Sequence, residues 1–372
     1  MKIEILKENL KTGLNITEKI VGKNLSLPIL DNVLIDTEDN FLSLSSTDLE
    51  TAIKLWILTR IVKKGKVVVP IKLLSSFVSS LPDEKILIES KGQNIEVECK
   101  NFKTQIQGHG TEDFPIFPEF KDAEFLEIES GKFCQGLSQI ADISSPSQTR
   151  PEISGIYFLF SKNSVKIVAT DSFRLAEKNI ILEKPLKKDF SFILPQKPAR
   201  EIMNVLGEKD GLLKIYFSPN QVLFEFPMKE VSHPQIQITS RLIEGEYPNY
   251  QDIIPKKFKT RAIIKRDEFL SQIKTASLFS GKINEIKFTV TNKEIEIFAK
   301  DPDIGESKST IAAKIEGDPI EVSFNYKFLT DGLSKIKSSE VSFDLSKEEG
   351  PCILKPVGDA SYVYVVMPIK ST

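Results

Sequence analysis

The chain has 372 residues, of which 40% are hydrophobic and 27% charged, an ordinary composition for a globular protein. Fifty basic and 52 acidic residues give a formal net charge of −2, which taken alone favours a surface without a polyanionic partner, although net charge does not report how charge is distributed. No window approaches ~18 consecutive apolar residues and the first eight residues hold no apolar signal block, so we expect neither a membrane span nor a signal peptide.

The three cysteines, Cys99, Cys134 and Cys352, lie far apart and form no CxxC motif. This spacing is typical neither of a disulfide framework nor of a zinc site. It fits a reducing compartment, and we therefore expect a cytoplasmic protein.

The chain opens with an alternating strand pattern at Ile3 and Ile5, followed by helical spacing at Leu10 and Leu14. A hairpin is predicted next, from residues 31–36 through a turn to residues 41–44. Further strands are predicted at 66–69, 86–89 and 95–99, and a second helix from Pro70 to Leu81.

This order of elements occurs three times. A turn phrase around Asp48 returns at Asp171 and more faintly at Asp301, with spacings of 123 and 130 residues. In each copy a hairpin-like segment begins 16 residues before the aspartate. Self-similarity at a constant spacing indicates a repeated structural unit.

The opening strand and first helix recur at constant shifts, through Leu126, Ile128, Phe133 and Leu137, and then Ala262, Ile264, Phe269 and Ile273. The second helix recurs from Pro195 to Leu206 and from Asn325 to Ile336. The same position in each second helix is a lysine: Lys72, Lys197 and Lys327.

Each unit is therefore predicted to hold two helices and seven or eight short strands, an α+β arrangement with antiparallel sheets. Aromatic-proline connectors at 112–118 and 246–255 separate the units. The predicted domains are residues 1–120, 121–250 and 251–372.

No set of residues for catalysis is visible. The two histidines, His109 and His233, are interpreted as surface residues, and no nucleotide, hydrolase or metalloprotease motif is present. Asp301 and Asp303 are interpreted as a turn rather than a metal site, and Asp48 and Asp171 as caps of their own turns. We expect no catalytic residues, no metal and no cofactor, and hence a binding or scaffold protein.

Four motifs in this order resemble the bacterial DNA polymerase III beta subunits, the sliding clamps. They are Leu27–Asn32 with Ser46–Glu50, then Thr170–Leu175, then Glu246–Tyr250 with Ile254-Pro255, and the terminal Tyr364–Ile369. The resemblance covers the whole chain. It implies a non-catalytic processivity factor that encircles duplex DNA and tethers the replicative polymerase, the clamp loader and repair factors.

The resemblance also implies a ring-shaped, head-to-tail homodimer with six similar domains, in which paired helices face the channel. By analogy Ile106 and Leu278 lie near the dimer contact. The residues implied to contact DNA, without sequence preference, are Lys23, Lys72, Arg150, Lys197 and Lys327. Without the family, the helix lysines would be interpreted as solvated residues at helix starts.

In the family a groove between the second and third domains binds short partner peptides. The matching positions are Ile153, Thr170, Ser172, Phe173, Arg174, Leu175, Pro248, Ile253, Ile283, Val365, Val366, Met367, Pro368 and Ile369. An apolar groove with Arg174 at its rim would suit an anchor-in-pocket mode. The alternative for Val365 to Ile369 is a last core strand, and both roles are compatible because alternate residues face opposite sides.

Two positions depart from the family pattern. Phe173 stands where the family often has histidine, and Asp252 stands where some members have arginine, so the preference for partner peptides could differ. Two other classes stay open. An enzyme with a site in a cleft between units would need a cluster of titratable residues, and a monomeric relative would bind protein partners without DNA.

Overall fold

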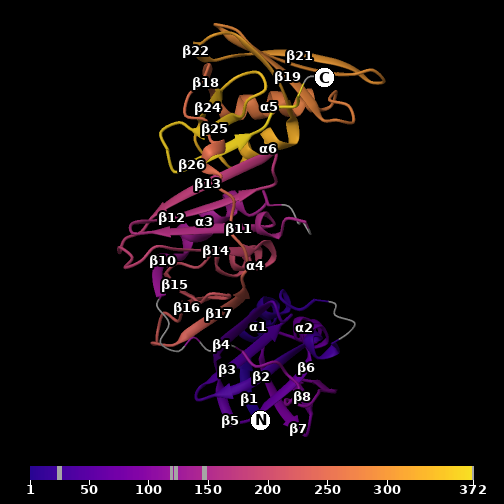
Figure 1. Cartoon of the computed structure of the whole chain (residues 1–372). Helices are drawn as coiled ribbons and strands as arrows, with labels where there is room; N and C mark the ends of the chain where they lie inside the picture. The colour runs from indigo at the N-terminus through magenta and orange to yellow at the C-terminus, as the bar shows by residue number, and fades with distance from the viewer. Residues whose placement is uncertain (23–26, 118–119, 121–124, 145–148, 371–372) are drawn as a thin grey trace. The chain divides into compact units, whose positions relative to one another are not determined.

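The computed structural model describes residues 1–22, 27–117, 120, 125–144 and 149–370 (Figure 1). These residues form six α-helices and 26 β-strands. The chain divides into two compact units, the first made of Met1–Cys134 with Lys197–Leu242 and the second of Gln135–Gln196 with Ile243–Thr372.

The helices occur as a first and a second helix in each repeat. They are α1 (Lys7–Glu18), α2 (Ile71–Ser80), α3 (Ser130–Ile140), α4 (Gln196–Leu206), α5 (Arg266–Ser277) and α6 (Tyr326–Lys335). The three predicted second helices are confirmed, with ends within one residue of the predicted ones. In α2 the buried residues Ile71, Leu74 and Val78 recur at helical spacing, so one face packs on the core while Lys72 faces solvent.

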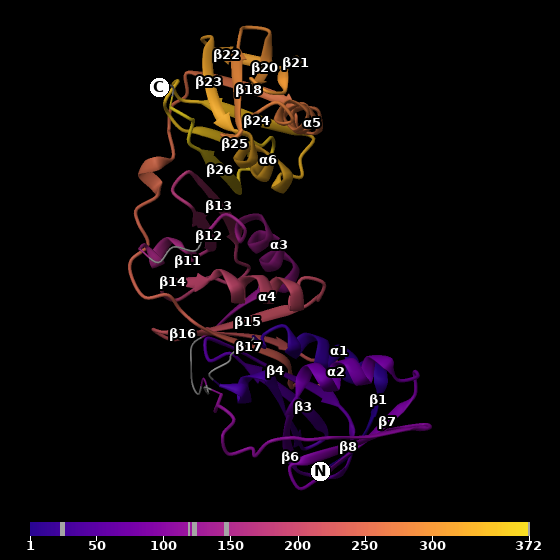
Figure 2. The same ribbon diagram turned by 90° about the vertical axis from the view of Figure 1, so that its right-hand side faces the viewer.

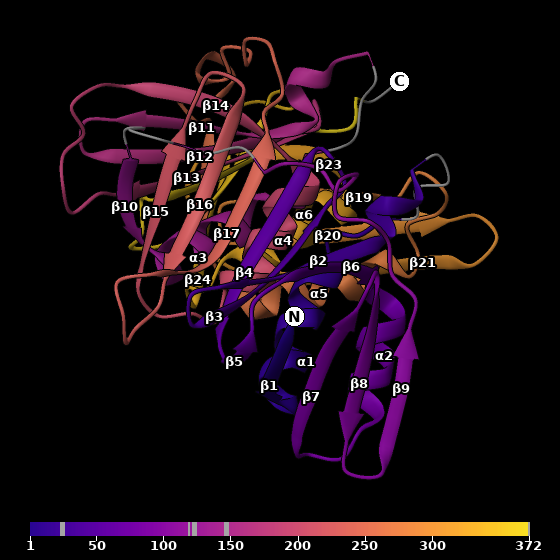
Figure 3. The ribbon, with the colours of Figure 1, turned by 90° about the horizontal axis from the view of Figure 1, so that it is seen from below.

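The first unit holds two antiparallel sheets. Their strands are β1 (Lys2–Leu6), β2 (Asn32–Glu38), β3 (Phe41–Thr47), β4 (Thr51–Leu58), β5 (Arg60–Lys63), β6 (Lys66–Pro70), β7 (Lys85–Lys91), β8 (Asn94–Cys99), β9 (Phe102–Ile106), β10 (Phe125–Glu129), β15 (Leu212–Phe217), β16 (Gln221–Pro227) and β17 (Pro234–Arg241). One sheet has the order β10-β15-β16-β17-β4-β3-β2-β6, and the other β5-β1-β7-β8-β9. Figure 3 shows β9 as the outermost strand beside β8.

The second unit also holds two antiparallel sheets. Their strands are β11 (Gly155–Ser161), β12 (Ser164–Thr170), β13 (Arg174–Ile181), β14 (Phe190–Pro195), β18 (Thr260–Lys265), β19 (Glu285–Val290), β20 (Glu294–Asp301), β21 (Gly305–Ala312), β22 (Lys314–Gly317), β23 (Ile320–Asn325), β24 (Glu340–Leu345), β25 (Cys352–Pro356) and β26 (Tyr362–Val366). Their orders are β14-β11-β12-β13-β26-β25-β24-β18-β22 and β21-β20-β19-β23.

The two large sheets each combine strands of two repeats. In the first unit β4 pairs with β17, with Thr51 opposite Ser240. In the second unit β13 pairs with β26, with Arg174 opposite Val366. The central repeat thus contributes strands to a sheet in each unit, and these pairings position the candidate site described below.

Aliphatic side chains fill the core of the first repeat. Residues such as Ile3, Leu10, Leu14 and Leu74 come from β1, α1 and α2 and are fully buried in one cluster. Helices α1 and α2 lie side by side over this core (Figure 2). Burial of such residues is the main favourable contribution to folding.

The predicted strand count differs from the structure. The first and third repeats each contain nine strands, β1 to β9 and β18 to β26, where seven or eight were expected. The extra strands include the short edge strands β5 and β22, in each of which three of the four residues are exposed and two are charged, so they lack the apolar alternation that predicts a strand.

Candidate functional site

The turn around Asp171 is held by its own carboxylate. The Oδ1 atom of Asp171 accepts the main-chain N–H groups of Phe173 at 3.0 Å and Arg174 at 2.9 Å. The hydroxyl of Thr170 accepts the N–H of Ser172, whose φ of 77° lies in the left-handed region. These bonds confirm the predicted capping role of Asp171 and leave the Phe173 side chain 61% exposed.

Strand β26 lies beside this turn because it pairs with β13. Leu175 is opposite Val365, and one residue beyond the strand the N–H of Met367 donates to the carbonyl oxygen of Phe173 at 2.8 Å. The pairing brings together the second and the last of the motifs on which the predicted pocket rests.

The guanidinium group of Arg174 ties this turn to helix α6. Its Nε donates to Asp171 Oδ2 at 2.9 Å, and a terminal nitrogen donates to the carboxylate of Asp331 on α6. The guanidinium carbon lies 4.9 Å from the centre of the Phe328 ring, also on α6. Burial disfavours the charged form, but Tyr364 and Asp331 outweigh it and raise the pKa of Arg174. The guanidinium group of Arg174 is therefore mostly occupied by contacts within the protein, whereas the sequence predicted it at the rim of the groove.

Helix α6 approaches β26 closely because Gly332 has no side chain. A Cβ atom at Gly332 would lie 2.4 Å from an atom of the Tyr364 ring. The Tyr364 hydroxyl donates to the carbonyl oxygen of Phe328 at 2.8 Å, and the Phe328 ring stacks on Phe173 with centroids 6.2 Å apart. The close contact thus places the Phe328 ring against the exposed Phe173.

Sequence reasoning missed Phe328 and Asp331 as parts of this site. Tyr364 lies in the terminal motif, so the resemblance could have pointed to it. Phe328 and Asp331 lie in an ordinary helical pattern, and only their contact with Arg174 distinguishes them.

The predicted pocket residues differ in accessibility. The first group is buried and can meet a ligand only after rearrangement: Ile153, Leu175, Val365 and Val366. The second group is exposed or half-buried: Thr170, Ser172, Phe173, Pro248, Ile253, Met367, Pro368 and Ile369. Val365 and Val366 are adjacent and both buried, so the C-terminal end of β26 is covered on both faces, whereas Met367, Pro368 and Ile369 after it are half-buried.

The connector after the second repeat is anchored by tyrosines. Tyr250 packs in an apolar cluster with Leu175 and Val365, and its hydroxyl donates to Glu177 Oε2 at 2.5 Å. Burial, reinforced by this bond, raises the pKa of Tyr250. The exposed Ile253 lies three residues after Tyr250, at the end of a short 3₁₀ helix (Gln251–Ile253) that follows this anchored tyrosine.

Two further predictions concern Asp252 at the pocket mouth and the pocket position Ile283. Asp252 is exposed and accepts a hydrogen bond from Asn249 at 2.7 Å, so its charge is held within the connector. Ile283 is exposed and lines a different cavity of about 470 Å³, together with Gly281 and Asp301.

The recurring lysines occupy the second position of the second helices α2, α4 and α6. Lys72, Lys197 and Lys327 are all exposed. A positive charge in the first turn of a helix interacts unfavourably with the helix dipole and lowers helix stability by about 0.3–1 kcal/mol. Helix stability therefore does not explain why lysine recurs at this position. Lys197 also donates to the carboxylate of Asp48.

The other two residues predicted to contact DNA lie in loops. Lys23 falls outside the described residues. Arg150 is exposed and its Nε lies 3.4 Å from Glu152 Oε1.

The two predicted dimer residues lie in different surroundings. Ile106 is in the edge strand β9, but its side chain is buried in the core of the first repeat. Leu278 is the C-terminal cap of α5 and its side chain is 69% exposed. Any contact of β9 with a second chain would thus involve its backbone and outer side chains rather than Ile106 itself.

In the part of the chain that the structure describes, no group of three or more His, Cys, Asp or Glu residues could hold a metal ion. The Asp301 carboxylate accepts the N–H of Asp303 at 2.8 Å, which confirms the predicted turn. His233 stacks on Phe41 with ring centroids 4.3 Å apart and is half-buried rather than a surface residue. No described helix is long and apolar enough to span a membrane.

Comparisons with known proteins agree over the whole chain. Three domains of the DNA polymerase III beta subunit match it: the N-terminal domain at residues 1–118, the central domain at 127–249 and the C-terminal domain at 251–370. The beta sliding clamps of Staphylococcus aureus and Staphylococcus epidermidis are 27% and 28% identical to it, each over the full length of both chains.

Solved structures give the same result. The DNA polymerase sliding clamp from Bacillus subtilis has a TM-score of 0.95 at 25% identity, and a DNA polymerase III beta subunit from Eubacterium rectale has 0.93 at 26%, with full coverage of both chains in each case. The chain therefore belongs to the DNA polymerase III beta subunit family, the non-catalytic DNA sliding clamps with three clamp domains.

Proposed function

We propose that this sliding clamp closes into a ring by pairing β9 of one copy with β21 of a second copy, head to tail. The observation that carries the proposal is the repeated use of one kind of strand pair. The strand after the Asp48 turn, β4, pairs with β17, the last strand of the second repeat. The strand after the Asp171 turn, β13, pairs with β26, the last strand of the third repeat.

The strand after the Asp301 turn is β21, and it forms the edge of its sheet. The last strand of the first repeat is β9, and it too forms an edge. Edge strands leave N–H and C=O groups unpaired and invite pairing with another chain. A β9–β21 pair between copies would repeat the two pairs within the chain and would be heterologous, which generates a closed ring when the rotation closes.

The exposed Leu278 suits this contact, because α5, which it caps, packs on β20 and β21. Two copies supply six clamp domains, which we assign to residues 1–120, 121–250 and 251–372 of each chain. The clamp is then a homodimer, and we place it in the cytoplasm on the basis of its role in replication.

The exposed Lys72, Lys197 and Lys327 support a role in holding DNA in the ring. Each is at the same position of the second helix of its repeat, where helix stability does not favour a cation. Lysine contacts to phosphates carry no sequence information and weaken with salt, which suits a ring that slides along duplex DNA. Arg150 and Lys23 would add loop contacts.

The partner groove is proposed to lie around Phe173 and Met367. The exposed Phe173 and Ile253 and the half-buried residues Met367, Pro368 and Ile369 would supply apolar surface over a buried floor of Leu175 and Val365. Such a surface suits short peptide segments from the replicative polymerase, the clamp loader and repair proteins. The buried Ile153 and Val366 would support the floor, and the exposed Ile283 would take part as a rim residue.

The ring is tested by loading the protein on nicked circular DNA with a clamp loader and then cutting the circle once. We expect retention on the circle and release after cutting, because a ring leaves through the ends. Retention on the linear product would indicate groove binding and overturn the ring. A matched circle that is nicked again instead of cut controls for loss during handling.

A further inference from the structure

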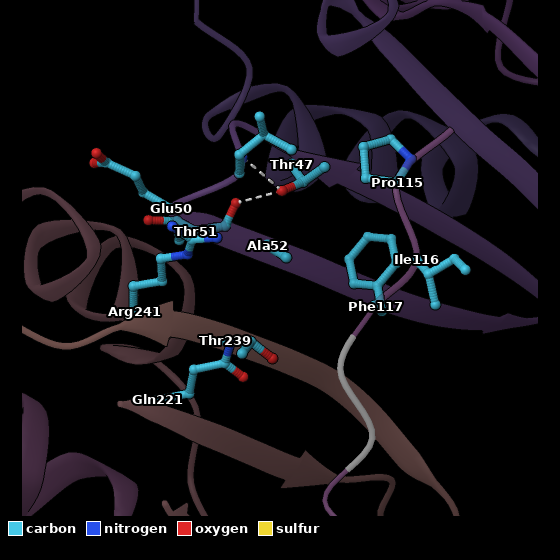
Figure 4. A pocket seen from close by; sticks show the side chains of 11 residues that line it. Thr47, Glu50, Thr51, Ala52, Pro115, Ile116, Phe117, Gln221, Thr239 and Arg241 are labelled. Atoms are coloured by element: carbon cyan, nitrogen blue, oxygen red, sulfur yellow. Dashed lines mark hydrogen bonds between the residues drawn. The ribbon is translucent and has the colours of Figure 1, made fainter. Parts of the chain in front are cut away.

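A pocket of about 260 Å³ lies in the first unit beside the Asp48 turn (Figure 4). Its lining includes Leu49 from the turn, Thr239 and Arg241 from β17, and Ile116 from the connector after the first repeat. Ile116 is 96% exposed, which is unusual for an isoleucine. The pocket thus combines apolar side chains with charges at its border.

The turn at this pocket has the same construction as the Asp171 turn. Asp48 Oδ1 accepts the N–H groups of Glu50 at 3.1 Å and Thr51 at 2.7 Å. The Thr47 hydroxyl donates to the carbonyl oxygen of Thr51 and accepts the N–H of Leu49, as the dashed lines in Figure 4 show. Leu49 has a φ of 74°, matching Ser172 in the second copy.

The neighbouring strand is also placed alike. The N–H of Arg241 donates to the carbonyl oxygen of Glu50 at 2.8 Å, which is the bond that Met367 makes to Phe173. This correspondence aligns Glu50 with Phe173 and Arg241 with Met367. The pocket therefore occupies, one repeat earlier, the position of the proposed partner groove.

The chemistry at the aligned positions differs. Where the proposed partner groove has the apolar Phe173 and Met367, this pocket has the acidic Glu50 and the basic Arg241. The side chains of Glu50 and Arg241 are exposed, and neither forms an ion pair with another residue that the structure describes. Both charges are thus available to a ligand.

We propose that this pocket is a second peptide-binding site, which receives one aliphatic side chain of an extended segment carrying an acidic residue opposite Arg241 and a basic residue opposite Glu50. The volume suits this occupant, because pockets that enclose a drug-sized ligand are larger, at about 300–1,000 Å³. The proposal does not depend on the groove around Phe173 being occupied, since its residues are different.

The test uses the full-length protein and methyl-resolved NMR, with the Ile116 and Thr239 methyl groups as reporters. The probes are acetyl-Lys-Ala-Leu-Ala-Asp-amide, its reversed order acetyl-Asp-Ala-Leu-Ala-Lys-amide, and the neutral acetyl-Gln-Ala-Leu-Ala-Asn-amide. We expect one charged order to shift both reporters saturably below about 10 mM, since short peptides bind weakly. The reversed order should bind about fivefold more weakly, the size expected for exposed ion pairs.

A double variant, Glu50→Arg with Arg241→Glu, exchanges the two charges on exposed side chains. We expect it to exchange the preference between the two charged orders, with resonances elsewhere unchanged. The proposal is overturned if no charged probe shifts Ile116 and Thr239 saturably, or if the order preference survives the exchange. Saturable shifts of Ile253 and Ile369 alone would place the probe in the other groove and would also overturn it.

Discussion

The main-chain N–H of Met367 donates a hydrogen bond of 2.8 Å to the carbonyl oxygen of Phe173. This bond joins the residue before β13 to the residue after β26, and of the two Phe173 is largely exposed and Met367 half-buried. A rigid aromatic ring next to a flexible thioether suits a groove that accepts several apolar anchors.

Truncation of both side chains should weaken peptide binding. We expect Phe173→Ala with Met367→Ala to lower the affinity for a polymerase-derived peptide by about tenfold or more, as for loss of an apolar anchor. Fluorescence anisotropy with a labelled peptide measures this. Ile181→Ala, at the far end of β13, removes a similarly exposed side chain and should leave the affinity unchanged. Equal affinity of the double variant and the wild type would contradict the groove assignment.

The Asp171 carboxylate should contribute measurably to stability. Asp171→Ala removes the acceptor of two main-chain N–H groups and of Arg174 Nε, and we expect a loss of about 1–2 kcal/mol in the free energy of unfolding of the domain. Asp171→Asn keeps an oxygen acceptor and should lose less. Urea unfolding followed by circular dichroism compares them, and equal stability of Asp171→Ala and wild type would show that the cap is dispensable.

A charge at Leu278 should separate the proposed dimer. We expect Leu278→Asp to shift the mass in sedimentation velocity from about 84 kDa, twice the 41.9 kDa chain, towards the monomer, because burying an unpaired carboxylate in an interface is costly. Leu58→Asp places the same charge on a residue of nearly equal exposure, 68% against 69%, at the end of β4 in the first unit. If both variants dissociate equally, or neither does, Leu278 is not at the contact.

Reversal of the helix charges should shorten retention on DNA. We expect Lys72→Glu with Lys197→Glu to reduce the residence time on nicked circular DNA and to lower the salt dependence of binding by about one unit of slope per lost contact. Surface plasmon resonance at several salt concentrations measures both. Lys162→Glu with Lys293→Glu makes the same change of net charge in exposed loops. An effect of equal size in this pair would indicate non-specific repulsion instead of channel contacts.

The buried thiols should be unreactive at neutral pH and should link stability to alkaline pH. Burial raises the pKa of Cys134 from 9.0 to about 11 and that of Cys352 well above 9.0. Because the pKa is higher in the folded than in the unfolded state, this stabilisation is complete below pH 9 and is lost as the pH rises towards 11. We expect no alkylation by iodoacetamide at pH 8 until the protein is denatured. Rapid labelling of native Cys134 at pH 8 would contradict its buried state.

Local features of the fold were predictable from the sequence. The three second helices, the Asp48 and Asp171 caps and the Asp301 turn follow from spacing and side-chain chemistry within a few residues. The family resemblance rested on short motifs at Thr170–Leu175 and Tyr364–Ile369, which the structure places side by side through β13 and β26.

The tertiary structure decided which of the predicted site residues are accessible. Leu175 and Val365 were predicted as pocket residues but are buried in an apolar cluster, and Arg174 is bound to Asp331 on a helix far along the chain. Such relationships depend on contacts between residues more than a hundred positions apart, for which one sequence carries no local signal. The pocket beside Arg241 and the edge position of β9 could not be predicted either, because both depend on which strands pair in the folded chain.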